Sequence, residues 1–166
     1  MDDLDVRLID LFSTEPRIGV LEASRRLGVA RGTVQARLDK LVERGVVTGW
    51  GPHLSPAALG YPVTAFLTLE IRQDAGTRPE DARAGGASGH DVVGEHLARI
   101  PEVLEAHTIT GAGDLFARVV AGSNADLQRV IDRVLAHPAI TRSSTVIALA
   151  TQVGYRALPL VRAAAT

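Results

Sequence analysis

The amino-acid sequence predicts an α+β protein. An N-terminal helix-turn-helix domain of three helices is followed by a ferredoxin-like βαββαβ domain with a four-stranded antiparallel sheet. Two observations support this prediction. Apolar residues recur at helical spacing through residues 1–44, and a three-residue turn that contains glycine joins two of these helices. From residue 63 onward the pattern changes to strand, helix, strand, strand, helix, strand.

The first two helices are predicted at residues 2–12 and 19–27. Leucines at helical spacing give the first helix one apolar stripe, and its first turn carries aspartates, which the helix dipole favours. The sequence Gly28-Val29-Ala30 leaves room only for a tight turn before the next helix. Two helices joined in this way are typical of a DNA-binding helix-turn-helix, although any small three-helix domain can also contain such a pair.

The third helix, residues 30–44, is the predicted recognition helix. Val34, Leu38 and Leu41 recur at i, i+4 and i+7, so this stripe must pack on the other helices and leave the opposite face open. Gly45 follows, where a helix C-terminus favours a residue that tolerates positive φ.

The segment after the helices is predicted to connect two domains. Residues 46–54 read as extended chain, and Trp50 between two glycines is expected to seal the hinge between the domains. Residues 55–62, with prolines at both ends, read as the linker. We therefore expect a DNA-binding domain at residues 1–54 and an effector-binding and oligomerisation domain at residues 63–166.

The second domain begins with a clear strand at residues 63–71, where alternate residues are apolar. Residues 73–89 are rich in glycine, alanine and charge, and are expected to form a surface loop. Asn124 is expected to cap the second helix of this domain. The remaining elements are predicted as a helix at 92–100, strands at 105–110 and 115–121, a helix ending before His137, and a long last strand at 140–153.

One face of the predicted sheet is too apolar to remain in water, because both helices are expected on the other face. It carries Phe66, Phe116 and Val120. We therefore expect a homodimer in which this face is covered by a second sheet. The last strand adds one of two sets to the face, either Val146, Ala148 and Ala150 or Thr145, Ile147 and Leu149.

Charge is distributed unevenly along the 166 residues, although the net charge is only -1. Residues 1–16 have a balance of -4, whereas residues 17–44 carry seven basic and three acidic side chains, a balance of +4. The helix pair is therefore a basic island, as nucleic-acid binding requires, although paired charges on a solvated face would give the same count. There is no cysteine and no apolar run long enough for a membrane span, so the cytoplasm is the expected location.

The open face of the third helix is small, polar and basic, and is expected to bind double-stranded DNA. Arg37 with Arg25 or Arg26 should contact phosphates, while Arg31, Thr33, Gln35 and Lys40 lie closest to base edges. Gly32 and Ala36 at the centre of this face offer no side-chain hydrogen bonds, so direct base readout should be sparse and DNA shape should carry much of the specificity.

The chain as a whole resembles the Lrp/AsnC, or feast/famine, family of transcription factors. The resemblance implies dimers that assemble into tetramers or octamers and bind small effectors, commonly amino acids. The two-fold axis of the expected dimer would set two recognition helices to read a palindromic promoter site. The resemblance rests on Leu4-Asp5, Ile9-Asp10-Leu11, Leu27-Gly28-Val29, Arg37-Leu38 with Leu41, Glu43-Arg44-Gly45-Val46-Val47, Gly49, Leu59-Gly60, Pro101-Glu102-Val103, Thr110-Gly111 with Asp114, Thr145 and Leu158-Pro159.

This sequence departs from the family pattern at three places. Ala30 stands where a serine usually caps the recognition helix, a loss of about 1 kcal/mol. The loop after the first strand of the second domain is longer, so the following helix should start late. The turn Gly111-Ala112-Gly113-Asp114 is followed by Leu115 instead of an aromatic residue.

The turn between the two central strands is the predicted effector site. Backbone N–H groups at Gly111 and Gly113 are open to a ligand carboxylate, and Asp114 could accept the ammonium of an α-amino acid. The alternative is that the glycines allow only a tight turn that Asp114 caps. The family pattern adds Thr145 as a polar neighbour.

Two other functions fit parts of the sequence, namely a metal-dependent enzyme and a small-ligand sensor with structural N-terminal helices. His90, Asp91, Glu95 and His96 are the only cluster that could hold a metal. The six-residue spacing of the histidines does not place both on one helical face, which favours solvated surface. We therefore expect no catalytic residue, metal or cofactor.

Overall fold

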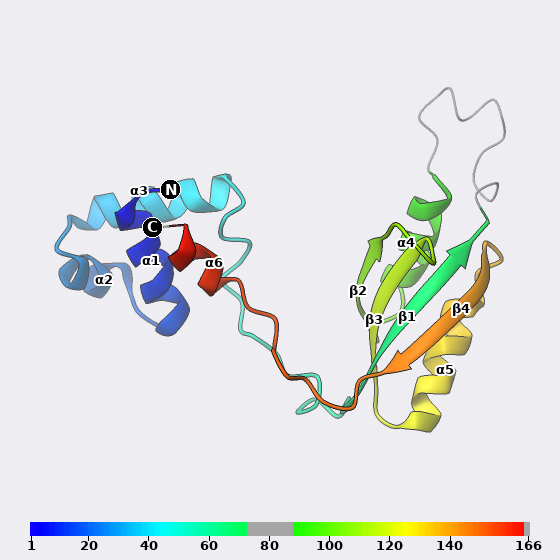
Figure 1. Ribbon diagram of the computed structural model, residues 1–166. Coiled ribbons are helices and arrows are strands. Elements are labelled where there is room, and N and C mark those ends of the chain that lie inside the picture. The colour runs from blue at the N-terminus through cyan, green and yellow to red at the C-terminus, as the bar shows by residue number, and fades with distance from the viewer. Residues whose placement is uncertain (73–87, 165–166) are drawn as a thin grey trace. The chain divides into compact units, whose positions relative to one another are not determined.

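The computed structural model describes residues 1–72 and 88–164, which form two compact units (Figure 1). Residues 1–53 and the segment from residue 152 form one unit, and residues 54–151 form the other. The C-terminal segment therefore belongs with the N-terminal helices, whereas the sequence placed it in a domain spanning 63–166. Of the surface loop expected at 73–89, residues 73–87 lie outside the described residues.

The helical unit contains the three predicted helices, α1 (Asp3–Thr14), α2 (Val20–Leu27) and α3 (Arg31–Glu43). Gly28 and Gly45 end the second and third helices with φ of 69° and 67°, a backbone conformation that side chains with a Cβ disfavour. The core residues come from one apolar stripe of each helix, as the spacing predicts. They are Leu8, Ala23, Val34 and Leu38, with Leu4, Leu11, Phe12, Ile18, Val20, Leu27 and Val29 packed around them.

A short helix that the sequence pattern does not predict, α6 (Leu158–Ala163), packs on α1 (Figure 1). The Nε of Arg162 donates to Oδ1 of Asp10 at 2.7 Å, so an ion pair joins the two helices. Six residues are too few to show a helical period, and such a helix is not stable alone in water. It forms because α1 offers a surface to pack on.

Trp50 contacts the helical unit. Its ring lies edge-on to Phe12 at the end of α1, with ring centroids 5.6 Å apart. This contact anchors the chain after α3 to the first helix, whereas we expected Trp50 to lie between the two domains. The extended chain predicted at residues 46–54 forms no strand.

The second unit is built on a four-stranded sheet with the order β2-β3-β1-β4, in which every neighbouring pair is antiparallel. This is the predicted ferredoxin-like order. The strands β1 (Val63–Ile71) and β3 (Leu115–Ala121) have the predicted bounds. The outer strand β2 (Val103–Thr108) begins and ends two residues earlier than predicted, and β4 (Ile140–Ile147) ends six residues earlier than predicted.

Two helices cover one face of this sheet, α4 (Gly89–Ala98) and α5 (Asn124–Leu135) (Figure 1). Ser88 and Asp91 form a capping box, which starts α4 three residues before the expected position. Ser123 caps α5, and the expected cap Asn124 is the first helical residue. The core under the helices contains Ala65, Leu67, Leu69, Val93, Leu97, Leu115, Ala117, Val119, Leu127, Val130 and Val134.

The other face of the sheet carries an aromatic pair. The rings of Phe66 and Phe116 are stacked, with centroids 5.6 Å apart and planes 14° from parallel. Val146 lies opposite Phe66 in the register, which assigns Val146 to this face and Thr145 to the other. Val120 is only 3 % exposed, so the chain itself already covers this residue and it is not available to a second subunit.

A histidine pair joins the two helices of the second unit. The rings of His96 on α4 and His137 after α5 lie 5.2 Å apart, and His96 Nε2 lies 2.9 Å from the carbonyl oxygen of Arg133. Nδ1 of His137 accepts the N–H of Ala139 at 3.2 Å, which requires this nitrogen to be unprotonated. Burial and the charge of His96 lower the pKa of His137 below its ordinary value of 6.5.

The lowered pKa of His137 predicts an acid-labile second unit. The unfolded chain binds a proton at His137 more readily than the native state does. The free energy of unfolding of the second unit therefore has its full contribution from neutral His137 above about pH 6.5, and this contribution decreases as the pH falls below that value. His137→Asn should reduce the decrease, because the amide oxygen accepts the same N–H without titrating. Melting temperatures between pH 7.5 and 5.5 measure the effect. An equal decrease in wild type and variant would contradict this role.

Candidate nucleic-acid interface and effector turn

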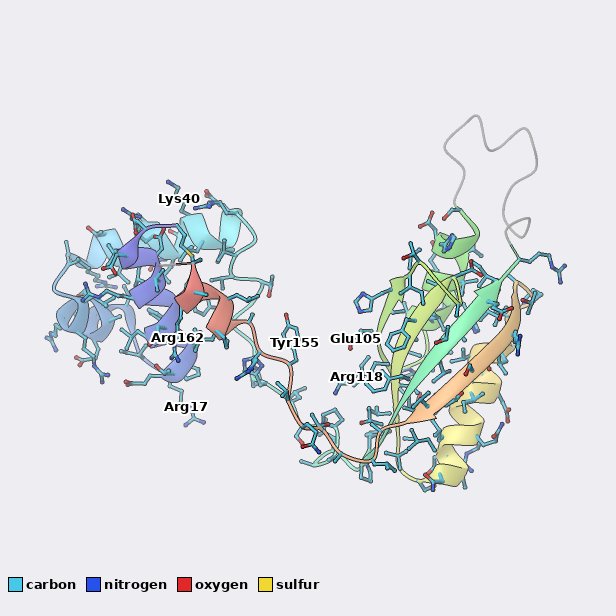
Figure 2. The ribbon with its side chains drawn as sticks, in the orientation of Figure 1. Arg17, Lys40, Glu105, Arg118, Tyr155 and Arg162 are labelled. Atoms are coloured by element: carbon cyan, nitrogen blue, oxygen red, sulfur yellow. The ribbon has the colours of Figure 1, made fainter. Side chains whose placement is uncertain are left out.

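The outer face of α3 is open along the length of the helix. Its N-terminal turn begins at Ala30, which makes no side-chain capping bond, as the missing hydroxyl predicts. Lys40 points outward from α3 (Figure 2). The residues expected closest to base edges, Arg31, Thr33, Gln35 and Lys40, are all exposed, and so are Gly32 and Ala36 between them.

Arg37 does not belong to this open face, because two carboxylates of α1 hold its guanidinium. Asp2 and Asp5 form the capping box of α1, and Nη1 of Arg37 bonds to both, at 3.0 Å from Oδ1 of Asp5. Asp5 is only 5 % exposed. The Asp5 N–H and the Arg37 guanidinium lower the pKa of Asp2, and the two carboxylates raise the pKa of Arg37.

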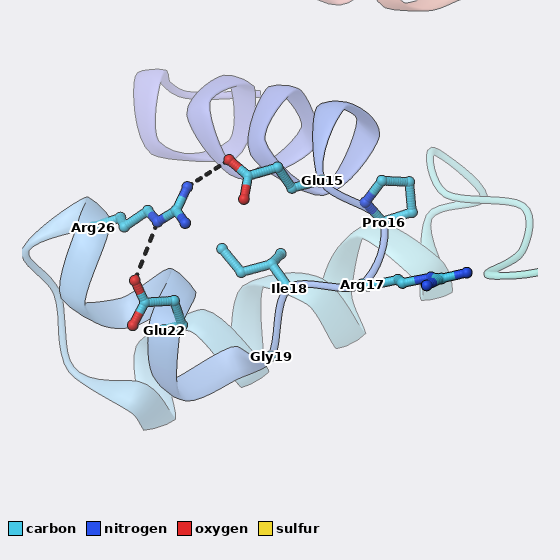
Figure 3. A pocket seen from close by; sticks show the side chains of 7 residues that line it. All are labelled: Glu15, Pro16, Arg17, Ile18, Gly19, Glu22 and Arg26. Carbon is cyan, nitrogen blue, oxygen red and sulfur yellow. Dashed lines mark hydrogen bonds and ion pairs between the residues drawn. The ribbon is translucent and has the colours of Figure 1, made fainter.

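The expected phosphate contacts on α2 also have acidic partners. Arg26 bridges Glu15 at 2.5 Å and Glu22 at 3.2 Å, as Figure 3 shows, and these carboxylates raise its pKa. Arg25 lies 3.8 Å from Glu22 in a more exposed pair. The bridge joins the end of α1 to α2 along a shallow hollow, from which Arg17 points away.

The structure therefore divides the basic island into two groups. Arg25, Arg26 and Arg37 form ion pairs with the chain's own acidic residues. Within residues 1–72 and 88–164, Arg31, Lys40 and Arg44 of α3 and its C-cap have no ion-pair partner. Arg17, between α1 and α2, also has no ion-pair partner among the described residues. No carboxylate of the described chain neutralises these charges, and Arg44 was absent from the residues proposed from the sequence.

The turn predicted to bind an effector is anchored to β1. Oδ2 of Asp114 accepts the N–H of Ile71 at 2.7 Å, and the Asp114 N–H donates to Leu69 at 2.9 Å. A Cβ at Gly113 would lie 2.4 Å from the Thr68 methyl group, and Gly111 has φ of 122°. The glycines and Asp114 thus shape and anchor a tight turn, which is the structural role that the sequence left open as an alternative to ligand binding. Oδ1 of Asp114 takes part in neither of these two hydrogen bonds.

Thr145 does not join this turn within one subunit. It lies opposite Leu67 on β4, whereas the turn leads into β3 on the other side of β1. Two strand spacings of about 4.8 Å therefore separate it from β3. Because β1 lies between them, Thr145 is not the polar neighbour of the turn within one subunit that the family pattern suggested. Its side chain is exposed.

The possible metal cluster has other partners. Asp91 accepts from Ser88 in the capping box of α4, which lowers the pKa of Asp91, and His96 faces the end of α5. Within the described residues, no three histidine, aspartate or glutamate side chains could hold a metal ion together. None of the helices described has the length and hydropathy to span a membrane.

Comparison with known families assigns both units. A model described as the AsnC-type helix-turn-helix domain matches residues 1–42, and one described as the Lrp/AsnC ligand binding domain matches residues 64–158. The chain belongs to the Lrp/AsnC family. It is therefore a DNA-binding transcriptional regulator, and this family is not one of enzymes.

Relatives and solved structures align with nearly the full Lrp/AsnC chain. The transcriptional regulator FL11 of Pyrococcus horikoshii is 25% identical over 160 residues, covering 96% of this chain and 97% of FL11. The AsnC structure of E. coli superposes with a TM-score of 0.77 at 25% identity, covering 96% and 99%. A feast or famine regulatory protein of M. tuberculosis, complexed with L-methionine, superposes with a TM-score of 0.74 at 26% identity, covering 94% and 97%.

The division of charges predicts different effects for two basic residues of α3. Lys40→Ala should reduce the slope of log K against log salt by up to about 0.9, because it removes from the DNA-facing side a cation that no carboxylate of the described chain neutralises. Arg37→Ala should leave this slope unchanged and lower the melting temperature by a few degrees, because Asp5 loses its partner. Fluorescence anisotropy with labelled duplex and thermal unfolding measure both. A reduced salt slope in Arg37→Ala would show that Arg37 contacts DNA.

Proposed function

We propose that this regulator binds palindromic promoter sites as a dimer and that a small effector, an amino acid, modulates binding or assembly. The observation that carries the proposal is the open face of α3, where Arg31, Lys40 and Arg44 have no acidic partner among the described residues. Two such helices, related by a two-fold axis, would reach successive major grooves about 34 Å apart.

A gel shift with the regulator's own upstream DNA, at several salt concentrations, tests this proposal. Salt-sensitive binding that survives competitor DNA is expected, with a two-fold symmetric footprint. Binding that competitor DNA of unrelated sequence removes equally well would contradict site recognition.

The stacked pair on the open sheet face supports dimerisation. Phe66 and Phe116 are only partly buried, and Val146 beside them is 64 % exposed. A second copy would remove this apolar surface from water, at about 25 cal/mol per Å². Charged residues border the pair, since Glu105 and Arg118 lie 3.8 Å apart on β2 and β3 (Figure 2).

Phe116→Asp should therefore give monomers, because it would bury a carboxylate in the apolar contact. Leu135→Asp is the matched control, since Leu135 is an exposed apolar residue on α5, which covers the opposite face of the sheet. Analytical ultracentrifugation measures both masses. If Phe116→Asp sediments as wild type, the dimer uses another surface.

An amino acid is the proposed effector because the M. tuberculosis relative was solved with L-methionine, and because the turn at Gly111 offers backbone N–H groups beside Asp114. One carboxylate oxygen of Asp114 accepts the N–H of Ile71, and the other accepts no hydrogen bond from the described residues. This second oxygen could accept a ligand ammonium while the first holds the turn. Thr145 of a neighbouring subunit could complete the site.

Asp114→Asn should remove the ligand-induced rise in melting temperature while the protein stays folded. The amide oxygen can still accept the Ile71 N–H, but the charge that attracts an ammonium is lost. Thermal unfolding with each of the twenty amino acids measures the rise in wild type first. If the variant retains the full rise, Asp114 is only a turn residue and the pocket lies elsewhere.

A further inference from the structure

An acidic residue lies on the DNA-facing side of α3. Asp39 is exposed on this helix, and its carboxylate would repel the phosphates of any duplex bound there. It is hydrogen-bonded to a residue expected to read bases. Nε2 of Gln35, one turn earlier, donates to Oδ1 of Asp39 at 2.9 Å.

We propose that Asp39 is a positioning residue, which orients the carboxamide of Gln35 to recognise adenine in the major groove. This inference rests on the proposed DNA binding by α3. It assigns a base to Gln35 and gives Asp39 a role that its charge alone would not predict.

The hydrogen-bonding groups of the pair match adenine. The Gln35 amide nitrogen has two hydrogens, and Asp39 accepts one of them. The second can donate to adenine N7 while Oε1 accepts from the adenine N6 amino group, which is the two-bond contact that glutamine makes with this base. Guanine presents acceptors at both O6 and N7, so Oε1 would face an acceptor.

The surroundings of Gln35 favour such a contact. Gln35 is exposed at the edge of this face, where it lines a hollow with Val42 and Trp50. Gly32 and Ala36 on the adjoining part of the face are small, so the helix can lie close to the bases. The bond to Asp39 also orders a side chain that otherwise loses much rotamer freedom on binding.

An identical pair elsewhere shows what a purely structural role would look like. On α5, Nε2 of Gln128 donates to Oδ1 of Asp132, also four residues later and also at 2.9 Å. Such pairs stabilise a helix slightly wherever they occur. The α5 pair is therefore the matched control for α3, because α5 packs on the sheet of the other unit.

The test begins with duplexes that wild type selects from a random library. Dissociation constants are then measured for every single base-pair replacement in the selected site, with wild type, Gln35→Ala, Asp39→Ala, Asp39→Asn and the control Asp132→Ala. Gln35→Ala should reduce discrimination by about tenfold at one position, and that position should be adenine.

The two Asp39 variants separate the hydrogen bond from the charge. Asp39→Ala should reduce discrimination severalfold at the same adenine, yet bind unrelated duplex more tightly, because a negative charge is removed. Asp39→Asn keeps an acceptor oxygen for Gln35, so it should retain discrimination while showing the same gain on unrelated duplex. Asp132→Ala should match wild type in both measurements.

Two results would overturn the inference while leaving DNA binding by α3 intact. One is that Asp39→Ala binds all duplexes more tightly with unchanged discrimination between bases. The other is that the base pair at which Gln35→Ala loses discrimination does not carry adenine. Failure of the wild type to select any duplex would instead contradict the proposed function itself.

Discussion

The arrangement of the helical unit depends on one ionic junction, in which the capping box at the N-terminus of α1 receives Arg37 from α3. Asp2 and Asp5 satisfy each other's backbone N–H groups, and their remaining oxygens bind the guanidinium. One set of carboxylates thus both starts the first helix and fixes the recognition helix beside it. Because Asp5 is almost completely buried, losing Arg37 would leave its carboxylate without a cationic partner, whereas losing Asp5 would leave Arg37 paired with Asp2 alone.

This use of Arg37 determines which charges remain for DNA. The sequence alone does not distinguish among the seven basic residues of 17–44. In the structure, three of them, Arg25, Arg26 and Arg37, form ion pairs with acidic residues of the same chain. Among the described residues four of these cations have no ion-pair partner. Arg31, Lys40 and Arg44 lie on α3 and its C-terminal cap, where Gly32 and Ala36 allow close approach, and Arg17 lies between α1 and α2. In the second unit, the Asp114 bond to Ile71 similarly places the proposed effector turn directly on the strand that forms the centre of the sheet.

Alternating or periodic apolar residues made much of this fold predictable. The bounds of β1 follow from its alternating pattern, those of β3 from a short apolar run after a glycine-containing turn, and α3 follows from Val34, Leu38 and Leu41. The sequence could not reveal α6, which is too short for a period, or the end of β4, where the apolar pattern continues into irregular chain. Nor could it show that Arg37 faces Asp2 and Asp5, that Val120 is already covered, or that Thr145 lies across β1 from the turn. These depend on contacts between residues distant in the chain.

We infer that the junction between α1 and α3 holds the recognition helix in the orientation that DNA binding needs. A double-mutant cycle with Asp5→Ala and Arg37→Ala, read out as affinity for the selected duplex, tests it most directly. Each single variant should weaken specific binding, and the double variant should bind no more weakly than Arg37→Ala alone. Additive losses, or an Asp5→Ala variant with wild-type affinity, would contradict it.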